Sequence, residues 1–275
     1  MEQKLIHFID NAFAPYNNVE RTKEDLTQHL LEKYRELIAE GKTADEAYRS
    51  TVDSIGDISD VIENQTFEAP AKTIDFSASD LKNVDLAGTV IRDGKFNASA
   101  AQHSNFNKAS LASAEFIASD LRGSDFQGAN LSGASFKATD LRESNFEGAN
   151  LANAKMDMAD FRDANLVNIN LTGATLKMVD LSGANFEGAT LTNTDFSKSN
   201  VSGISFDGLT LVGTVFSNMG KKGLKGTSFK NATLRSVSFH HSDAKEAIFD
   251  GATVDKLTYA SLQGVRANLT NVTVI

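Results

Sequence analysis

Apolar residues recur every five positions along most of this chain. Stepping by five from Phe76 to Phe216 visits 29 positions, and all of them are apolar, mainly Phe and Leu. Two positions earlier lies a small residue, Ala, Ser or Thr, in most repeats. This period matches neither the 3.6 residues of a helix nor the two of a strand. A coil that turns a corner after each pentad can point both residues inward, and such coils stack about 4.8 Å apart.

The two kinds of large residue alternate, which predicts four pentads in each coil. Phenylalanine recurs every ten residues and leucine fills the alternate pentads, so four faces place Phe columns on two opposite sides and Leu columns on the other two. The predicted core columns contain Phe96, Phe106, Phe116, Phe126, Phe136 and Phe146, with Leu111, Leu121, Leu131, Leu141 and Leu151 between them.

The repeat itself identifies a protein family by resemblance. The string SDLRGSDFQGANLSGASFKATDLRESNFEGANLANA repeats the unit A(D/N)LXX and resembles the pentapeptide-repeat proteins. The resemblance covers about three quarters of the chain. It implies a mainly β fold, a right-handed quadrilateral β-helix.

The five-residue register breaks once. After Phe216 it resumes at Leu224 and runs to Tyr259, which indicates an inserted loop at 217–223. We therefore expect a β-helix of about nine coils over residues 74–262. Residues 263–275 leave the pattern, and their apolar side chains must either cap the open end of the core or form a dimerisation tail.

Residues 1–65 contain signals for the start and end of helices and no pentads. Apolar positions at helical spacing fill 22–40 and stop at Gly41, and Thr43 with Glu46 predicts a capping box for the next helix. The run LTQHLLEKYRELIAEGKTADEAYRSTVDSIGDISDVIE resembles the HAAS-type helical signalling domain of Firmicute regulatory and membrane-associated proteins, which implies a protein-interaction role. The alternative is an acidic helical cap that seals the first coil. Residues 66–73 are the predicted linker.

The net charge of −9 is concentrated in the helical segment. Residues 1–70 hold 15 acidic and 7 basic residues, which leaves 21 acidic against 20 basic residues for the repeats. No stretch is apolar enough to span a membrane, and the absence of cysteine excludes disulfides and thiolate metal sites. We expect a soluble, bacterial, cytoplasmic protein that does not bind nucleic acid directly.

Stacking by twenty residues indicates which outward side chains form columns. Asp80, Asp120, Asp140, Asp160 and Asp180 share one column, and Lys82, Arg122, Arg142 and Arg162 share the column beside it. A neighbouring basic column compensates the self-repulsion of an aspartate column, so we favour a structural role over a binding strip.

The inserted loop is the other candidate for contact with a partner. Lys221 and Lys222 make a small basic projection there, although a tolerated surface insertion explains them equally simply. The five histidines show no metal-ligand spacing and no pairing with a nucleophile. The sequence therefore offers no catalytic residue, metal site or cofactor site.

These observations predict a non-enzymatic scaffold or regulatory module that binds a protein partner through a rigid rod. The alternative comes from the family resemblance: a DNA-mimicking inhibitor or protector of gyrase or topoisomerase IV, similar to quinolone-resistance pentapeptide proteins. A mimic needs a strongly negative rod, whereas these repeats carry a net charge of −1. We further expect a homodimer through the C-terminal tail.

Overall fold

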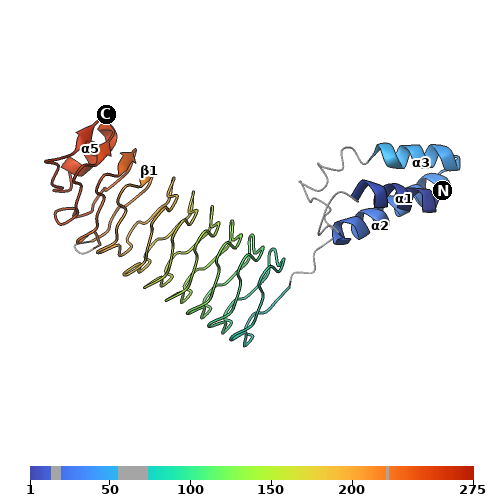
Figure 1. Ribbon diagram of the computed structural model, residues 1–275, viewed down its shortest axis with the longest axis horizontal. Helices are drawn as coiled ribbons and strands as arrows, with labels where there is room; N and C mark the ends of the chain where they lie inside the picture. Colours follow the sequence, from blue (N-terminus) through green and yellow to red (C-terminus); the bar gives the residue numbers. More distant parts are fainter. Residues whose placement is uncertain (14–19, 55–73, 221–222) are drawn as a thin grey trace. The chain divides into compact units, whose positions relative to one another are not determined.

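The computed structural model describes residues 1–13, 20–54, 74–220 and 223–275. Figure 1 shows a set of helices followed by a stack of coils. The chain divides into two compact units, Met1–Lys72 and Thr73–Ile275, which we call the helical unit and the β-helix. The predicted linker at 66–73 lies outside the described residues.

The helical unit contains α1 (Glu2–Phe13), α2 (Glu20–Ala39) and α3 (Ala44–Asp53). The predicted capping box begins α3: the Thr43 side chain accepts a hydrogen bond from the Glu46 N–H, and the Glu46 carboxylate accepts one from the Thr43 N–H at 3.0 Å. One face of each helix supplies a shared core. Its buried members are Leu5, Ile9, Leu26, Leu30, Leu31, Tyr34 and Ala47.

The β-helix is built from short parallel bridges between residues twenty apart. Asp120 pairs with Asp140 and Asp140 with Asp160, and the same spacing links coils from Asp75 to Asn200. The backbone donates from each inward residue to the next coil, as from Leu121 N–H to the Asp140 carbonyl at 2.8 Å. Four pentads therefore close each coil, as the sequence predicted.

The core contains the predicted columns. Phe106 and Phe126 are stacked with centroids 4.7 Å apart, and Phe116 meets Phe126 edge to face at 5.9 Å. The stacked and edge-to-face contacts are the two geometries that aromatic quadrupoles favour. Buried hydroxyls line the interior too: Ser119 Oγ donates to the Phe96 carbonyl at 2.5 Å. All eleven predicted core residues are buried.

The insertion changes the spacing between coils from twenty to twenty-three. Strand β1 (Thr210–Val212) pairs with β2 (Thr233–Arg235), so that Thr210 faces Thr233. The next pairing, of β2 with β3 (Thr253–Val254), returns to a spacing of twenty. Three extra residues are thus absorbed within one coil, where the sequence placed them.

The C-terminal end departs from the prediction that pentads continue to residue 262. Helix α5 (Lys256–Gln263) replaces one edge of the last coil, because the Asp255 carboxylate accepts the Thr258 N–H at 2.8 Å and caps a helix. Thr258 and Leu262 are buried, whereas Tyr259, the predicted inward residue, is only partly buried. Strand β4 (Thr273–Val274) then pairs with β3 and completes a four-stranded parallel sheet.

Candidate interaction surfaces

One face of the β-helix carries what we call the Asp–Arg ladder, made of Asp120, Arg122, Asp140, Arg142, Asp160 and Arg162. Each arginine holds the aspartate two residues earlier with both Nε and Nη2, at 2.9 and 2.6 Å in the case of Arg122. Arg122 Nε also lies 3.5 Å from Asp140 Oδ2, and Arg142 Nε lies 3.6 Å from Asp160 Oδ2. The ladder therefore links three successive coils through alternating charges.

Each aspartate of the ladder has a second role in the corner of its coil. Asp120 Oδ1 accepts the Arg122 backbone N–H at 3.3 Å, a side-chain turn that fixes the chain as it leaves the bridge. The Arg122 guanidinium, followed by further hydrogen bonds, lowers the pKa of Asp120 to about 2. At Asp160 partial burial opposes ionisation, but the hydrogen bonds from Arg162 outweigh it and lower the pKa. Asp120 and Asp160 therefore stay charged at any ordinary pH.

The ion pairs of the ladder link neighbouring coils, as a structural role requires. Its arginines nevertheless remain accessible to a partner. Their side chains are 47%, 35% and 44% exposed, so solvent screens each ion pair and its contribution to stability is small. Lys82, in the same column, forms no ion pair with any residue that the structure describes. The three arginines thus present a pre-ordered row of donors to the surface.

A second column joins coils through amides. Asn170 Nδ2 donates to Asn150 Oδ1 at 3.0 Å, and Asn150 Nδ2 to Asn130 Oδ1 at 3.4 Å. Each of these side chains also accepts the backbone N–H two residues later. These side chains therefore form hydrogen bonds within their own coil and with the neighbouring coils.

The inserted loop is described at its two ends only. Lys221 and Lys222 lie outside the described residues, so their role in binding stays a prediction. Before them Met219 is buried, and after them the Gly223 carbonyl accepts the Val201 N–H at 3.1 Å. A Cβ on Gly223 would lie 2.1 Å from the Met219 carbonyl oxygen, so this end of the loop requires glycine.

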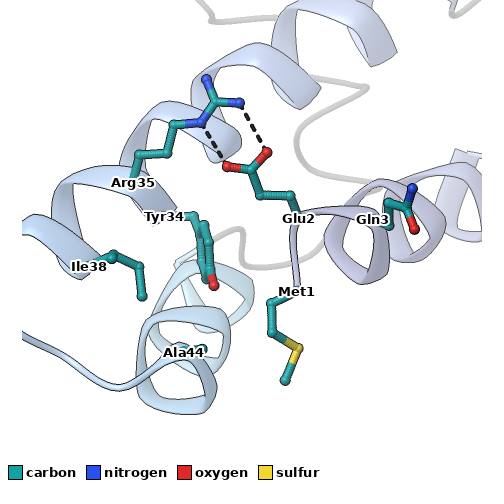
Figure 2. A pocket seen from close by; sticks show the side chains of 7 residues that line it. All are labelled: Met1, Glu2, Gln3, Tyr34, Arg35, Ile38 and Ala44. Atoms are coloured by element: carbon teal, nitrogen blue, oxygen red, sulfur yellow. Dashed lines mark hydrogen bonds and ion pairs between the residues drawn. The ribbon is translucent and has the colours of Figure 1, made fainter.

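The helical unit has a shallow pocket of about 580 Å³ between the start of α1, the end of α2 and the start of α3. Figure 2 shows Arg35 reaching across it to Glu2, with two hydrogen bonds of 2.8 and 3.0 Å. The hydrogen bond from Arg35 lowers the pKa of Glu2. Tyr34, Ile38 and Met1 supply an apolar wall. The pocket is open, its charged side chains Glu2 and Arg35 are paired with each other, and it was not apparent from the sequence.

A further feature, which the period of five does not reveal, lies on one corner of the β-helix. The second residue after each inward residue adopts the left-handed conformation, which favours Gly, Asn and Asp. At three corners the described residues in this position are glycine or polar. The fourth corner is apolar over its first six described coils, before the polar Lys198 and Asn218. We call these six residues the apolar corner, with φ between 54° and 63°: Ala78, Ala98, Ala118, Ala138, Met158 and Met178.

Within the described ranges, no group of three or more His, Asp or Glu side chains is arranged to hold a metal ion. Of the helices described, none is long and apolar enough to cross a membrane.

Comparison with known proteins places the repeats in one family. The family model of the pentapeptide repeat region matches residues 71–146 and 139–216, and the model of pentapeptide repeats (8 copies) matches residues 224–252. Together these matches cover more than half of the chain. No curated protein matches. Among solved structures, a trypsin-treated form of the plasmid-mediated fluoroquinolone resistance protein QnrB1 is 22% identical, covering 74% of this chain and 90% of its own, with a TM-score of 0.43.

A second similar structure is HetL, a pentapeptide-repeat protein involved in heterocyst differentiation regulation in the cyanobacterium Nostoc sp. strain PCC 7120. It is 20% identical, covers 72% of this chain and 95% of its own, and has a TM-score of 0.27. Rfr23 from Cyanothece 51142 is 19% identical, with 49% and 95% coverage and a TM-score of 0.25. The family matches confirm the right-handed quadrilateral β-helix that the resemblance implied, which agrees with the four pentads per coil predicted from the alternation of Phe and Leu. The chain belongs to the pentapeptide-repeat family.

Proposed function

We propose that this protein is a non-enzymatic scaffold or regulatory binding module that acts in a bacterial cytoplasm by presenting the faces of its β-helix to a protein partner. The observation that carries the proposal is the Asp–Arg ladder. Its six side chains hold one another in place over three coils while the arginines remain about half exposed. Arginine that is already ordered loses little entropy on binding, which is why it is frequent at protein interfaces.

The rest of the β-helix supports a binding role over a catalytic one. Its interior is filled by apolar side chains that are almost completely buried, so a ligand can meet only the exterior. A pocket of about 220 Å³ on the β-helix lies beside Lys245 and Asn268, and it offers less room than small-molecule sites usually provide.

The test is a triple substitution of the ladder arginines, R122S/R142S/R162S, in the full-length protein used as bait in its source cells. We expect a specific partner to be recovered by the wild type and lost from the triple variant. A matched control, K108S/K230S/K245S, removes three lysines from other columns and should leave recovery unchanged. Equal recovery by both variants would remove the ladder from the proposal, and the absence of any partner of the wild type would remove the proposal.

The helical unit provides a second proposed contact. Its resemblance to HAAS-type domains and its excess of acidic residues support a role in receiving a signalling partner. A chain lacking residues 1–65 should lose a subset of the recovered proteins while the β-helix keeps its cooperative unfolding. An unchanged set would favour the alternative, in which the unit only caps the solenoid.

The C-terminal tail supports a proposed homodimer. Strand β4 is the last strand of its sheet, and Val274 and Ile275 are 43% and 53% exposed. Light scattering on V274K/I275K should report half the mass of the wild type. An identical mass for the two proteins would exclude pairing through this edge.

The alternative, mimicry of DNA toward gyrase or topoisomerase IV, is supported less well. Pairing of Asp120, Asp140 and Asp160 with arginine removes the row of unneutralised carboxylates that a DNA mimic would present. A gyrase supercoiling assay separates the two functions. We expect neither inhibition nor protection at micromolar protein, and inhibition would replace our proposal with this one.

A further inference from the structure

We infer that the pocket of the helical unit binds a large, uncharged apolar side chain of a partner protein, together with the main-chain carbonyl beside it. The inference rests on the proposed contact between the helical unit and a partner, and it specifies the chemical group that makes this contact. The pocket lies where the start of α1, the last turn of α2 and the first residue of α3 meet. All its walls therefore belong to one unit of the chain.

The first observation is where the exposed apolar side chains of the helical unit lie. Met1 and Ile38 are 42% and 39% exposed, and both line the pocket. Among the residues described in this unit, they are the two large apolar side chains that solvent reaches to this extent. The methyl group of Ala44 adds to the same lining. Exposed apolar side chains that line one hollow are typical of a binding site.

The second observation is an unpaired hydroxyl in the wall of the pocket. Tyr34 is 7% exposed, and its hydroxyl forms no hydrogen bond with any residue that the structure describes. Figure 2 shows the Tyr34 ring between Ile38 and Met1, with the hydroxyl pointing toward Ala44. A tyrosine hydroxyl buried to this degree usually has a hydrogen-bond partner. A main-chain carbonyl that enters the pocket with an apolar side chain supplies the missing acceptor.

The third observation is the balance of charge around the pocket. Arg35 Nε and Nη2 donate to the Glu2 carboxylate at 2.8 and 3.0 Å. Arg35 first, and then the Met1 amino group, lower the pKa of Glu2, while Glu2 and after it Glu32 raise the pKa of Arg35. Two positive groups thus face two carboxylates, and the lining contains no other charged side chain. This balance favours an uncharged occupant, because burying an unpaired charge is costly.

The shape of the pocket favours a side chain of a protein over a free small molecule. Its volume of about 580 Å³ admits an aromatic or leucine side chain with the main chain that carries it. The pocket is shallow, whereas small-molecule sites enclose most of their ligand. A partner protein covers the mouth around the side chain that it inserts, as at the anchor residues of protein interfaces. The ion pair of Glu2 with Arg35 joins α1 to α2, so the walls are in place before the partner binds.

A peptide selection on the full-length protein tests the inference. The probe is a displayed library of 12-residue peptides with every position varied, and fluorescence anisotropy measures the affinity of the selected peptides. We expect sequences with a Leu, Phe or Met anchor that bind I38S at least about fivefold more weakly than the wild type. Y34F should weaken them about threefold or more and leave the unfolding free energy unchanged, because the hydroxyl has no partner to lose in the free protein.

Matched controls remove comparable groups elsewhere. V90S removes an apolar side chain that is 64% exposed on the β-helix, and Y48F removes the hydroxyl of another tyrosine of the helical unit. Both should change affinity less than about twofold. In the peptide, replacing the anchor by alanine should weaken binding to the wild type at least about tenfold and binding to I38S by less, because the two changes remove the same contact.

The inference is overturned if no peptide is selected, if no selected peptide distinguishes I38S from the wild type, or if Y34F binds as the wild type does. Peptides that tolerate lysine or aspartate at the anchor, or an affinity of N-acetyl-leucine amide alone that equals theirs, would also overturn it. Peptides that lose affinity only for R122S/R142S/R162S would overturn it and leave the proposed function in place. The proposed function fails separately, when the wild type recovers no partner from its source cells.

Discussion

The helical unit and the β-helix bury their apolar residues on different sequence scales. In the described part of the helical unit, α1, α2 and α3 contribute seven buried apolar side chains at helical spacing to one small core. In the β-helix a core residue such as Phe126 packs against Phe106 and Phe146, each twenty residues away. A helix can form its own hydrogen bonds, whereas a coil of the β-helix depends on both neighbours. A destabilising substitution in the β-helix should therefore affect the adjacent coils, whereas one in the helical unit should affect only its own helix or cap.

The largest expected effect comes from the centre of a phenylalanine column. Phe126→Ala removes two stacked contacts with centroids at 4.7 and 4.8 Å and leaves a cavity, which should cost about 3 to 5 kcal/mol of unfolding free energy. Guanidinium unfolding followed by circular dichroism measures it. Phe76→Ala, in the first described coil, where Phe96 is its one stacked partner among the described residues, should cost less than half as much. Equal losses would contradict the dependence of each coil on two neighbours.

A smaller effect is expected from the buried hydroxyls. Ser119→Ala removes the donor to the Phe96 carbonyl, which retains a longer bond of 3.3 Å from the Ser99 N–H. The loss should be about 1 kcal/mol. Ser119→Thr keeps the donor, as Thr139 does one coil later toward Phe116, and should be close to neutral. The same unfolding experiment distinguishes them, and a larger loss for threonine than for alanine would refute the role of the hydroxyl.

The helical unit should respond locally. Thr43→Ala breaks the capping box of α3 and should cost about 1 kcal/mol of local stability. Hydrogen exchange should report faster exchange in α3 and unchanged exchange in the coils from residue 74 onward. Thr43→Ser serves as the control because it keeps the accepting oxygen. Faster exchange throughout the β-helix would show that the two units do not respond independently.

The smallest effect concerns pH and the Asp–Arg ladder. The folded-state pKa of Asp120 is about 2, below the ordinary value of 3.8, so its contribution to stability is present above pH about 4 and is lost as pH falls toward 2. Arg122→Gln should move the pKa of Asp120 upward, because the guanidinium is the largest cause of the shift. A carboxyl titration by NMR measures this change. An unchanged pKa would show that the hydrogen bonds from Gln102 and from the Arg122 backbone N–H set it instead.

Much of the β-helix could be predicted from the sequence because its core pattern is one-dimensional. A period of five with alternating Phe and Leu determines which side chains point inward and how coils stack, so Phe106 above Phe126 follows directly. The position of the insertion follows from the step between Phe216 and Leu224. The ladder could be predicted as a column, but the sharing of Arg122 between Asp120 and Asp140 depends on rotamers that spacing does not specify.

Other features escaped for identifiable reasons. Tyr259 lies in phase with the pentads, but the cap at Asp255 followed by Thr258 starts a helix that competes with the coil. The apolar corner is visible only when outward positions are compared at intervals of twenty, which places Ala138 beside Met158 and Met178. Charged columns were the signal for outward contacts, and the apolar corner contains no charged residue between residues 78 and 178.

The central claim is that coils of twenty residues stack into one continuous interior. Deleting residues 121–140 removes one whole coil and joins Asp120 to Leu141, so every remaining column stays in phase. Deleting 121–138 removes nearly the same length but shifts all later inward residues by two positions. We predict that the first deletion keeps the β spectrum and a single cooperative unfolding transition of the β-helix, and that the second loses both. Equal behaviour of the two proteins would contradict the account.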